Sequence, residues 1–232
     1  MTDDPDRPLA LITGASRGIG AAVARTLADD HDLLLGGRDP QALVALAGEL
    51  PSATPWPVDL TDDAAVAQAV RGLDRLDVLV HCAGVGLLGT VAETPAATWR
   101  HQFEVNVVAV AELTRLLLPA LRAARGRVVL LNSGAGHAAR AGWASYAASK
   151  FALRAFADAL RAEEGGNGVR VTSVHPGRTD TDMQREVVRQ ESGEYRPERY
   201  LRVESVAAAV ALAVRASADA EVVEVVVRPA TA

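Results

Sequence analysis

Short apolar runs alternate with longer segments of helical periodicity along most of the chain. The runs are short enough for buried strands and are bounded by turn residues, and they lie at residues 8–13, 32–37, 55–59, 77–84, 126–133, 169–175 and 221–227. The intervening segments have apolar residues at helical spacing and predict helices over residues 21–28, 40–50, 62–71, 95–125, about 146–164, and 205–216. The helical segment 95–125 contains an interruption near Asn106 and carries Pro119.

This alternation predicts an α/β fold built on a doubly wound parallel sheet of about seven strands. The strands are apolar throughout, which suits a sheet covered by helices on both faces. No linker, repeat or low-complexity segment interrupts the 232 residues, so we expect one domain over residues 1–232. A polar, arginine-rich stretch from Arg178 to Arg202 lacks the apolar periodicity of its neighbours.

Composition narrows the range of partners. The net charge is −5 and the arginines are scattered, so a nucleic-acid partner is not expected. No apolar run reaches the ~18 residues that a membrane span needs. The N-terminal segment MTDDPDRP is acidic and lacks signal-peptide features, and the single Cys82 excludes an internal disulfide. These features favour a cytoplasmic protein.

A glycine-rich turn follows the first predicted strand. Gly14, Gly18 and Gly20 lie in TGASRGIG, directly before the first helix. Glycine permits a tight turn and close backbone approach, and a helix N-terminus presents free N–H groups to an anion. The spacing is GxxxGxG, and its place between a strand and a helix indicates a dinucleotide pyrophosphate site.

The segment after the fifth strand places a phenol and an ammonium on one helix face. Tyr146 and Lys150 are four residues apart, and Ser133 lies upstream at the end of the strand. Lys150 is the only lysine, since every other basic residue of the 24 is arginine. Unlike guanidinium, an ammonium can give up a proton, and a nearby cation favours a phenolate. Taken alone, the pair also fits a helix with one buried tyrosine and one solvated lysine.

Together, these motifs resemble the short-chain dehydrogenase/reductase family in its single-domain branch. The similarity rests on TGASRGIG, on HCAG at residues 81–84 and on HPGRTDT at residues 175–181, and on four residues that match the family's catalytic tetrad: Asn106, Ser133, Tyr146 and Lys150. HCAG departs from the family's usual NNAG. The resemblance implies a Rossmann-type fold, a variable substrate lid at about residues 180–203, and homodimers or homotetramers.

The resemblance also implies roles for the tetrad. Tyr146 is the general acid/base, Lys150 lowers its pKa and binds the nicotinamide ribose, Ser133 polarises the substrate carbonyl, and Asn106 holds a water that links the lysine to solvent. The implied cofactor contacts are Gly14, Ser16, Arg17, Gly18, Ile19, Gly20, Arg38, Asp59, Leu60, Cys82, Ala83, Gly84, Tyr146, Lys150, Pro176, Gly177, Thr179 and Thr181.

Two arginines favour NADP(H) over NAD(H). Arg17 lies inside the glycine turn and Arg38 directly follows the second strand, where an arginine can accommodate a 2′-phosphate. NAD-preferring sites usually offer an acid at this strand end, and Gly37 stands there instead. Asp39 follows the arginine and favours NAD if its carboxylate turns toward the ribose. Asp59 has the family's place beside the adenine, or else caps the strand end.

For several other reactive side chains, the sequence leaves more than one role open. The five histidines show no metal-ligand spacing, so no metal site is expected. His137 lies near the expected cleft mouth and either contacts substrate or faces solvent. Cys82 is either a redox thiol or a small buried apolar residue. Tyr195 and Tyr200, in the lid, are either ligand anchors or loop packing.

These observations predict an NADP(H)-dependent oxidoreductase that interconverts a small-molecule carbonyl and a secondary alcohol. A catalytically silent dinucleotide sensor or scaffold is the alternative, because fold alone does not determine turnover. A sugar-nucleotide epimerase or dehydratase of the longer related branch fits less well, since the chain has neither GxxGxxG spacing nor a large C-terminal substrate domain. The lid sequence does not identify the substrate.

Overall fold

The computed structural model describes residues 7–230, and residues 1–6 of the acidic N-terminal segment lie outside this range. Its core is one parallel sheet of seven strands in the order β3-β2-β1-β4-β5-β6-β7. The strands are β1 (Leu9–Thr13), β2 (Asp32–Gly37), β3 (Ala53–Pro57), β4 (Val78–His81), β5 (Arg127–Leu131), β6 (Arg170–Pro176) and β7 (Glu224–Val227). The predicted α/β class and parallel sheet are confirmed.

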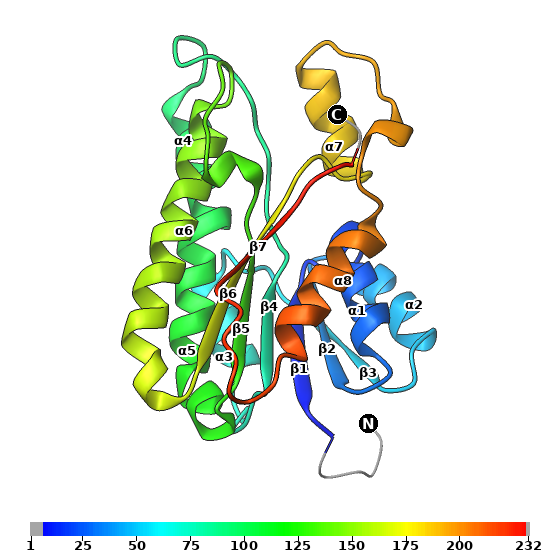
Figure 1. Ribbon diagram of the computed structural model, residues 1–232, viewed down its shortest axis with the longest axis vertical. Coiled ribbons are helices and arrows are strands. Elements are labelled where there is room, and N and C mark those ends of the chain that lie inside the picture. Colours follow the sequence, from blue (N-terminus) through cyan, green and yellow to red (C-terminus); the bar gives the residue numbers. More distant parts are fainter. Residues whose placement is uncertain (1–6, 231–232) are drawn as a thin grey trace.

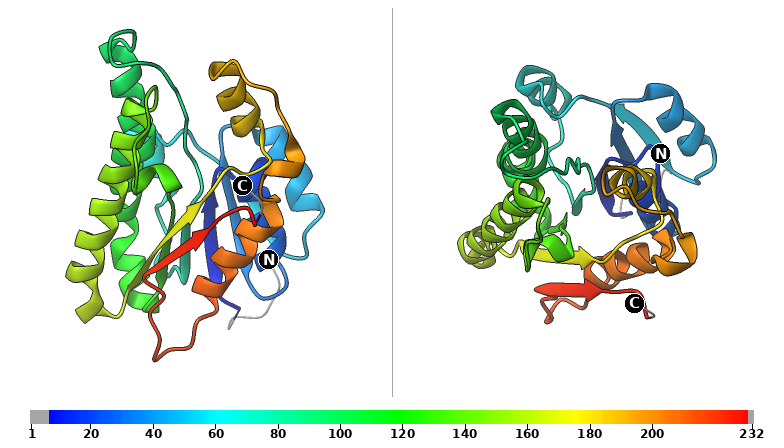
Figure 2. Two further views of the ribbon diagram at one scale, coloured as in Figure 1. Left: turned by 45° about the horizontal axis from the view of Figure 1, so that its top comes forward. Right: turned by 90° about the horizontal axis from the view of Figure 1, so that it is seen from above.

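Helices cover both faces of the sheet (Figures 1 and 2). Neighbouring strand residues point to opposite faces, so Ile12 joins the core under one helix layer and Leu11 joins the core under the other. The first layer contains α1 (Gly18–Leu27), α2 (Pro40–Gly48) and α8 (Val203–Val214), and the second contains α3 (Asp63–Ala69), α5 (Ala109–Ala124) and α6 (Ala144–Glu164).

The strand order reverses beside β1, where β2 lies on one side and β4 on the other. Open α/β sheets bind ligands outside the carboxyl ends of the strands at such a switch point. Thr13, the last residue of β1, is paired with His81, the last residue of β4. Its hydroxyl oxygen accepts hydrogen bonds from the backbone N–H groups of Cys82 and Ala83, both at 3.1 Å. The two strand ends are thus joined directly at the predicted ligand-binding edge.

The third strand ends earlier than predicted. The sequence pattern places its end at Asp59, whereas β3 ends at Pro57. The carboxylate of Asp59 accepts hydrogen bonds from the backbone N–H of Thr61 at 3.0 Å and from its hydroxyl at 2.8 Å. This turn ends the strand, because an aspartate that bonds two residues ahead folds the backbone away from the sheet.

The stretch 178–202 contains regular structure that the sequence pattern did not predict. It includes helix α7 (Asp182–Gln190) and a short 3-10 turn at Pro197–Arg199. Thr181 caps α7 by accepting a hydrogen bond from the N–H of Gln184, and Val187 and Val188 are buried. The sequence analysis found no apolar periodicity in this stretch and predicted no helix there, which was wrong. The two buried valines are enough to pack a short helix against the rest of the protein.

The interruption predicted near Asn106 is confirmed. Helix α4 (Ala96–Phe103) passes into a π-helical turn, Glu104–Val108, before α5 begins. Pro119 is accommodated inside α5. Such π-turns are rare and frequently occur at functional sites. No helix within residues 7–230 is long and apolar enough to cross a membrane.

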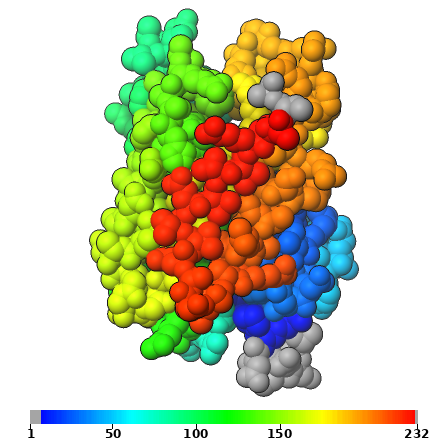
Figure 3. All heavy atoms as spheres, in the orientation of Figure 1, coloured from blue at the N-terminus to red at the C-terminus, as the bar shows by residue number. Residues whose placement is uncertain are grey.

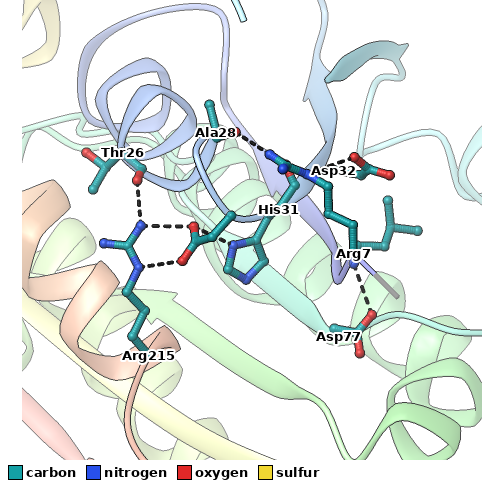
Figure 4. A network of polar contacts seen from close by, with 9 residues as sticks. Arg7, Thr26, Ala28, His31, Asp32, Asp77 and Arg215 are labelled. Atoms are coloured by element: carbon teal, nitrogen blue, oxygen red, sulfur yellow. Dashed lines mark hydrogen bonds and ion pairs between the residues drawn. The ribbon is translucent and has the colours of Figure 1, made fainter. Parts of the chain in front are cut away.

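Strand β7, the last strand of the chain, lies at one edge of the sheet. In Figure 3, the segment that contains β7 (red) crosses the surface between α6 and α8. Near the amino end of β2, a polar network joins Arg215, the residue directly after α8, to the end of α1 and its connection to β2 (Figure 4). There Arg215 binds the carboxylate of Asp30 at 2.8 and 2.9 Å and the backbone carbonyl of Thr26 at 2.9 Å.

Candidate active site

Helix α6 directs Tyr146 and Lys150 toward the carboxyl edge of the sheet. Lys150 is only 5% exposed, and its ammonium donates a hydrogen bond to the carbonyl oxygen of Leu131 at 3.0 Å. The same ammonium lies 5.9 Å from the centre of the Tyr146 ring. The phenol also packs edge-on against Trp143, with ring centres 5.8 Å apart. The one-face arrangement predicted from the spacing is therefore present.

Burial shifts the pKa of both groups. It lowers the pKa of Lys150 to about 8. It raises the pKa of Tyr146, opposed by a hydrogen bond to the side chain of Ser133. The sequence-based expectation was that Lys150 lowers the tyrosine pKa. In this structure the direction is opposite, because desolvation of the phenolate dominates and the ammonium is directed at Leu131.

Ser133 follows β5 and is fixed by its neighbour. The side-chain oxygen of Asn132 accepts the backbone N–H of Ser133 at 2.9 Å, and its amide donates to the carbonyl of Lys150 at 3.2 Å. Asn132 is buried, so it couples the strand end to helix α6. Sequence reasoning missed it, although a polar residue directly after an apolar strand, beside Ser133, was an available signal.

Asn106 links the loop after β4 to α6. Its side-chain oxygen accepts the backbone N–H of Val85, and its amide donates to the carbonyl of Val85, both at 2.9 Å. The amide also donates to the hydroxyl of Ser149 at 3.0 Å, and that hydroxyl donates to the carbonyl of Tyr146. Ser149 was missed by the sequence analysis, because a serine in a helix gives no distinctive signal.

Gly84 lies in this loop, close to two members of the predicted tetrad. A Cβ at Gly84 would lie 3.2 Å from the side-chain oxygen of Asn106 and 3.9 Å from the ammonium of Lys150. The turn after β4 is therefore in direct contact with two members of the predicted tetrad. Three of the four tetrad residues, Ser133, Tyr146 and Lys150, lie on or beside α6, and Asn106 reaches them through Ser149.

The glycine turn has the form that a pyrophosphate site needs. Gly14 and Gly18 have positive φ angles of 66° and 56°. A Cβ at Gly14 would lie 2.8 Å from the backbone nitrogen of Ala83, and one at Gly20 would lie 2.2 Å from the carbonyl of Gly14. Arg17 gives α1 no side-chain cap, so the first N–H groups of the helix are available to an anion. These residues fit a nicotinamide dinucleotide.

The segment after β6 closes over this turn. Gly177 donates its backbone N–H to the carbonyl of Val227 at 2.7 Å, and Thr179 donates its hydroxyl to the carbonyl of Gly177 at 3.1 Å. Thr181 is so near the glycine turn that a Cβ at Gly18 would lie 3.5 Å from its methyl group. The first and last motifs of the predicted cofactor site are therefore adjacent in space.

Residues around the end of β2 differ in what their side chains contact. Arg38 is exposed, whereas Asp39 caps α2, its carboxylate accepting the N–H groups of Gln41 and Ala42 at 3.1 and 3.0 Å. Hydrogen bonds from Thr61 lower the pKa of the Asp59 carboxyl, and the charge of Arg38 adds to this effect.

Some predicted cofactor contacts direct their side chains into the core. Those of Ile19 and Cys82 pack against the core cluster of α1, and that of Leu60 packs against the cluster on the other face. Burial raises the pKa of the Cys82 thiol to about 12, so it stays protonated at neutral pH. This favours the small apolar interpretation of Cys82 over a redox thiol.

The two lid tyrosines pack within the lid. The rings of Tyr195 and Tyr200 are 5.1 Å apart, and the guanidinium of Arg185 lies 4.2 Å from the centre of the Tyr195 ring. The Tyr195 hydroxyl donates a hydrogen bond to Asp180. These contacts favour loop packing over a role as ligand anchors.

Two glutamines hold the loop after β4 and were not anticipated. Gln190, at the end of α7, accepts the N–H of Leu88 at 2.7 Å. Gln102 accepts the N–H of Leu87 at 2.7 Å and donates to the hydroxyl of Ser145 at 2.8 Å. Gln190 was missed because helix α7 itself was not predicted.

A pocket of about 540 Å³ lies beside the glycine turn, between α1 and the segment that contains α7. Arg17 and Gly18 form one wall, and Asp182 and Arg185 form the opposite wall. The ion pair between Arg17 and Asp182, at 3.5 Å, spans the two walls. The pocket adjoins the predicted pyrophosphate site and does not reach the tetrad.

Fold and site together define a nucleotide-binding α/β oxidoreductase. Residues 8–192 match the family described as short chain dehydrogenase. The chain is 37% identical over 181 residues to serine 3-dehydrogenase from Rhizobium radiobacter, covering 75% of this chain and 72% of that protein. It is 37% identical over 185 residues to glycine betaine reductase ATRR from Emericella nidulans, covering 75% of this chain but only 15% of that protein.

A solved structure agrees over nearly the whole chain. The alcohol dehydrogenase from the archaeon Thermococcus sibiricus, complexed with 5-hydroxy-NADP, superposes with a TM-score of 0.87 and 27% identity, covering 96% of this chain and 97% of that one. The protein therefore belongs to the short-chain dehydrogenase/reductase family. It is an NAD(P)-dependent dehydrogenase that acts on the CH–OH group of a small molecule.

Proposed function

We propose that the protein is an NADP(H)-dependent enzyme that interconverts a carbonyl and a secondary alcohol, with Tyr146 as the general acid/base. The observation that carries the proposal is the arrangement of the buried Lys150 and the partly buried Ser133 around the Tyr146 phenol. A bound nicotinamide dinucleotide supplies or accepts the hydride, and the chain's own residues handle the proton and the oxygen.

In the reductive direction, Tyr146 donates a proton to the carbonyl oxygen. Its raised pKa keeps the phenol protonated at neutral pH, which suits a proton donor. The hydroxyl of Ser133, which lies next to the phenol, turns its single proton to the same substrate oxygen when a substrate binds. This polarises the carbonyl and stabilises negative charge as it develops.

Lys150 and Asn106 help to return a proton to Tyr146 after it has given its own to the substrate. With its pKa lowered to about 8, Lys150 exchanges its proton near neutral pH, which an arginine would not do. Asn106 holds the loop at Val85 and, through Ser149, the helix turn that carries Tyr146. We propose that it also holds the water that connects Lys150 to solvent.

The cofactor preference rests on Arg38 and Asp39. One carboxylate oxygen of Asp39, Oδ1, accepts both N–H groups that begin α2, so helix capping competes with any bond from this carboxylate to the ribose hydroxyls. Arg38 is exposed at the same strand end and can bind a 2′-phosphate, and Arg17 lies within the glycine turn. The NADP derivative in the Thermococcus sibiricus enzyme is consistent with this preference.

We further propose that residues 180–203 close over the site as a lid. Gln190 and Thr181 attach this segment to the loop after β4 and to the glycine turn, so cofactor binding can change both attachments. Hydrogen exchange with and without NADPH tests this. Stronger protection of residues 180–203 with NADPH is the expected result, and equal strong protection in both states would exclude a lid.

We propose a homodimer or homotetramer in a cytoplasmic setting. Two large apolar side chains, Val108 before α5 and Phe151 on α6, are 46% and 42% exposed. A second copy that covers them would remove apolar surface from water. Light scattering on the wild type and on Phe151→Asp measures the oligomeric state, and an unchanged wild-type oligomer in the variant would exclude this face.

A reductase assay separates the enzyme from a silent dinucleotide sensor. Purified protein is incubated with NADPH and a panel of ketones, aldehydes, acyl thioesters and sugars, and absorbance of the reduced cofactor is followed. Carbonyl-dependent oxidation supports the proposal. Tight NADPH binding without oxidation by any carbonyl or reverse reaction with any alcohol would favour the sensor.

A further inference from the structure

Three side chains with metal-binding atoms meet behind the Ser133 loop. His137 ends the short turn after Ser133, His175 lies in β6, and Glu224 begins β7. Their ligand atoms all lie within 4.8 Å of one another. The histidines were expected to bind no metal because they show no ligand spacing in the sequence. Strand pairing brings them together, since Glu224 is paired with Ser173, whose side chain shares a sheet face with that of His175.

His175 is held in the orientation of a metal ligand. Its side chain is fully buried, and its Nδ1 donates a hydrogen bond to the carbonyl oxygen of Ser133 at 3.0 Å. Because Nδ1 carries the proton in this bond, Nε2 presents a free lone pair. Nε2 has no hydrogen-bond partner among residues 7–230. Ligating histidines typically donate their other ring nitrogen to a carbonyl or carboxylate in this way.

His137 and Glu224 complete the cluster. The imidazole rings of His137 and His175 have centres 4.1 Å apart. One carboxylate oxygen of Glu224 lies 3.1 Å from Nε2 of His137 and the other lies 3.7 Å from Nε2 of His175. The shorter approach does not have hydrogen-bond geometry, because Nε2 of His137 is also without a partner in the part of the chain that the structure describes.

These separations suit a small tetrahedral cation. Zinc–nitrogen and zinc–oxygen bonds of about 2.0–2.2 Å place tetrahedral ligand atoms roughly 3.3–3.6 Å apart. We propose that His137, His175 and Glu224 form a binding site for a divalent transition-metal ion, of which Zn²⁺ is the best fit. Two imidazole nitrogens and one carboxylate are ligands that zinc accepts, and a fourth position is left for water.

The surrounding charges are compatible with such an ion. Burial lowers the pKa of His175, opposed by its hydrogen bond to Ser133 and by the charge of Glu224, and a lowered pKa favours the neutral imidazole that ligation requires. Arg154 is the neighbouring cation, with its Nε 3.9 Å from Glu224, and its side chain is 41% exposed. It can therefore turn toward solvent when a metal takes the carboxylate.

A metal at this place would connect the sheet edge to the catalytic loop. Glu224 belongs to the edge strand β7, and the carbonyl that orients His175 belongs to Ser133 itself. The ion would lie outside the tetrad and would act by fastening β7 and the Ser133 loop to β6. We therefore assign it a structural role.

The test is zinc binding by tag-free protein that has been treated with a chelator and desalted. Isothermal titration with Zn²⁺ measures stoichiometry and affinity, and Co²⁺ gives a visible absorption band when bound tetrahedrally. We expect one ion per chain and a rise in the thermal midpoint on binding. His137→Gln and Glu224→Gln should each weaken binding by at least about 10-fold, since even groups that only support ligands have effects of this size.

His101→Gln is the matched control, because His101 is an exposed histidine of α4 outside the cluster. It should bind Zn²⁺ like the wild type. His175 is left unchanged because it is buried and its replacement could prevent folding. Absence of stoichiometric binding by the wild type would overturn the proposal. So would unchanged affinity in both His137→Gln and Glu224→Gln, which would place the ion elsewhere.

Discussion

The ammonium of Lys150 donates a hydrogen bond to the backbone carbonyl of Leu131 across 3.0 Å, and burial lowers its pKa to about 8. Lys150 is therefore charged below pH 8 and loses its proton as the pH rises through this value. The Tyr146 phenol, with a raised pKa, stays protonated over the same range. The two groups thus titrate in separate pH ranges.

This separation predicts the pH profile of carbonyl reduction. kcat/KM should fall above about pH 8, because the relay then lacks the proton that Lys150 supplies. Rates measured from pH 6 to 10 at saturating NADPH test this. Lys150→Arg should have low activity and no inflection near pH 8. A wild-type profile that stays flat to pH 10 would show that the Lys150 proton is not required.

Arg38→Asp should shift the cofactor preference from NADP toward NAD. A charge-assisted hydrogen bond contributes roughly 1.5–3 kcal/mol, so the ratio of kcat/KM values should change by about 10- to 100-fold. Arg115→Asp, at an exposed site on α5 paired with Glu112, is the control and should leave the ratio unchanged. Wild-type preference for NAD would mean that this assignment of Arg38 is wrong.

Asp39→Ala separates helix capping from cofactor choice. The variant loses two hydrogen bonds at the start of α2 and should be less stable by about 1 kcal/mol. Its NADP-to-NAD ratio should stay close to that of the wild type. Denaturant unfolding and cofactor kinetics measure the two effects, and a strong rise in NADP preference would show that the carboxylate faces the ribose.

Gly20→Ala should disrupt the cofactor turn, because the new Cβ would lie 2.2 Å from the carbonyl oxygen of Gly14. We expect large losses of NADPH affinity and of thermal stability. Gly48→Ala is the matched control, since nothing lies within 4 Å of its Cβ at the end of α2. It should be neutral or stabilising by up to about 1 kcal/mol. Equal effects of the two changes would contradict the packing described for the turn.

Arg215→Ala should weaken the protein's stability at mildly acidic and neutral pH. Hydrogen bonds from Arg215 and His31 lower the pKa of the Asp30 carboxyl from 3.8 to about 2. Because the folded pKa is the lower one, this stabilisation is present above about pH 4 and is lost as the pH falls toward 2.

The pair of Arg215 and Asp30 is nearly half exposed, so the loss should not exceed about 1 kcal/mol. Thermal unfolding from pH 2 to 7 should show wild type and variant converging toward pH 2. Arg115→Ala removes another exposed ion pair and serves as the control. A difference that grows as the pH falls would contradict this linkage.

Local pattern was sufficient to predict most of the sheet and part of the site. Strand β2 has the predicted bounds, and Tyr146 and Lys150 share a helix face because helical geometry requires it. Side-chain partners across the fold were not predictable. Asn132 was visible as a polar residue after an apolar strand, but its bond to Lys150 depends on loop closure, and the approach of Glu224 to His137 depends on strand pairing.

The direction of the Tyr146 pKa shift was missed for a related reason. Helical spacing placed a cation near the phenol, but the shift depends on how deeply the phenol is buried and on where the ammonium points. Helix α7 was missed because it has few apolar residues, and because its hydrogen bond from Gln190 to the loop after β4 is a contact across the fold.

The central claim is that Tyr146 transfers the proton, and Tyr146→Phe tests it most directly. The change keeps the ring that packs against Trp143 and removes only the hydroxyl. With a carbonyl that the wild type reduces, kcat/KM should fall by at least about 100-fold, while the NADPH dissociation constant measured by fluorescence should stay within a few-fold of wild type. Near-wild-type turnover by Tyr146→Phe would contradict the account.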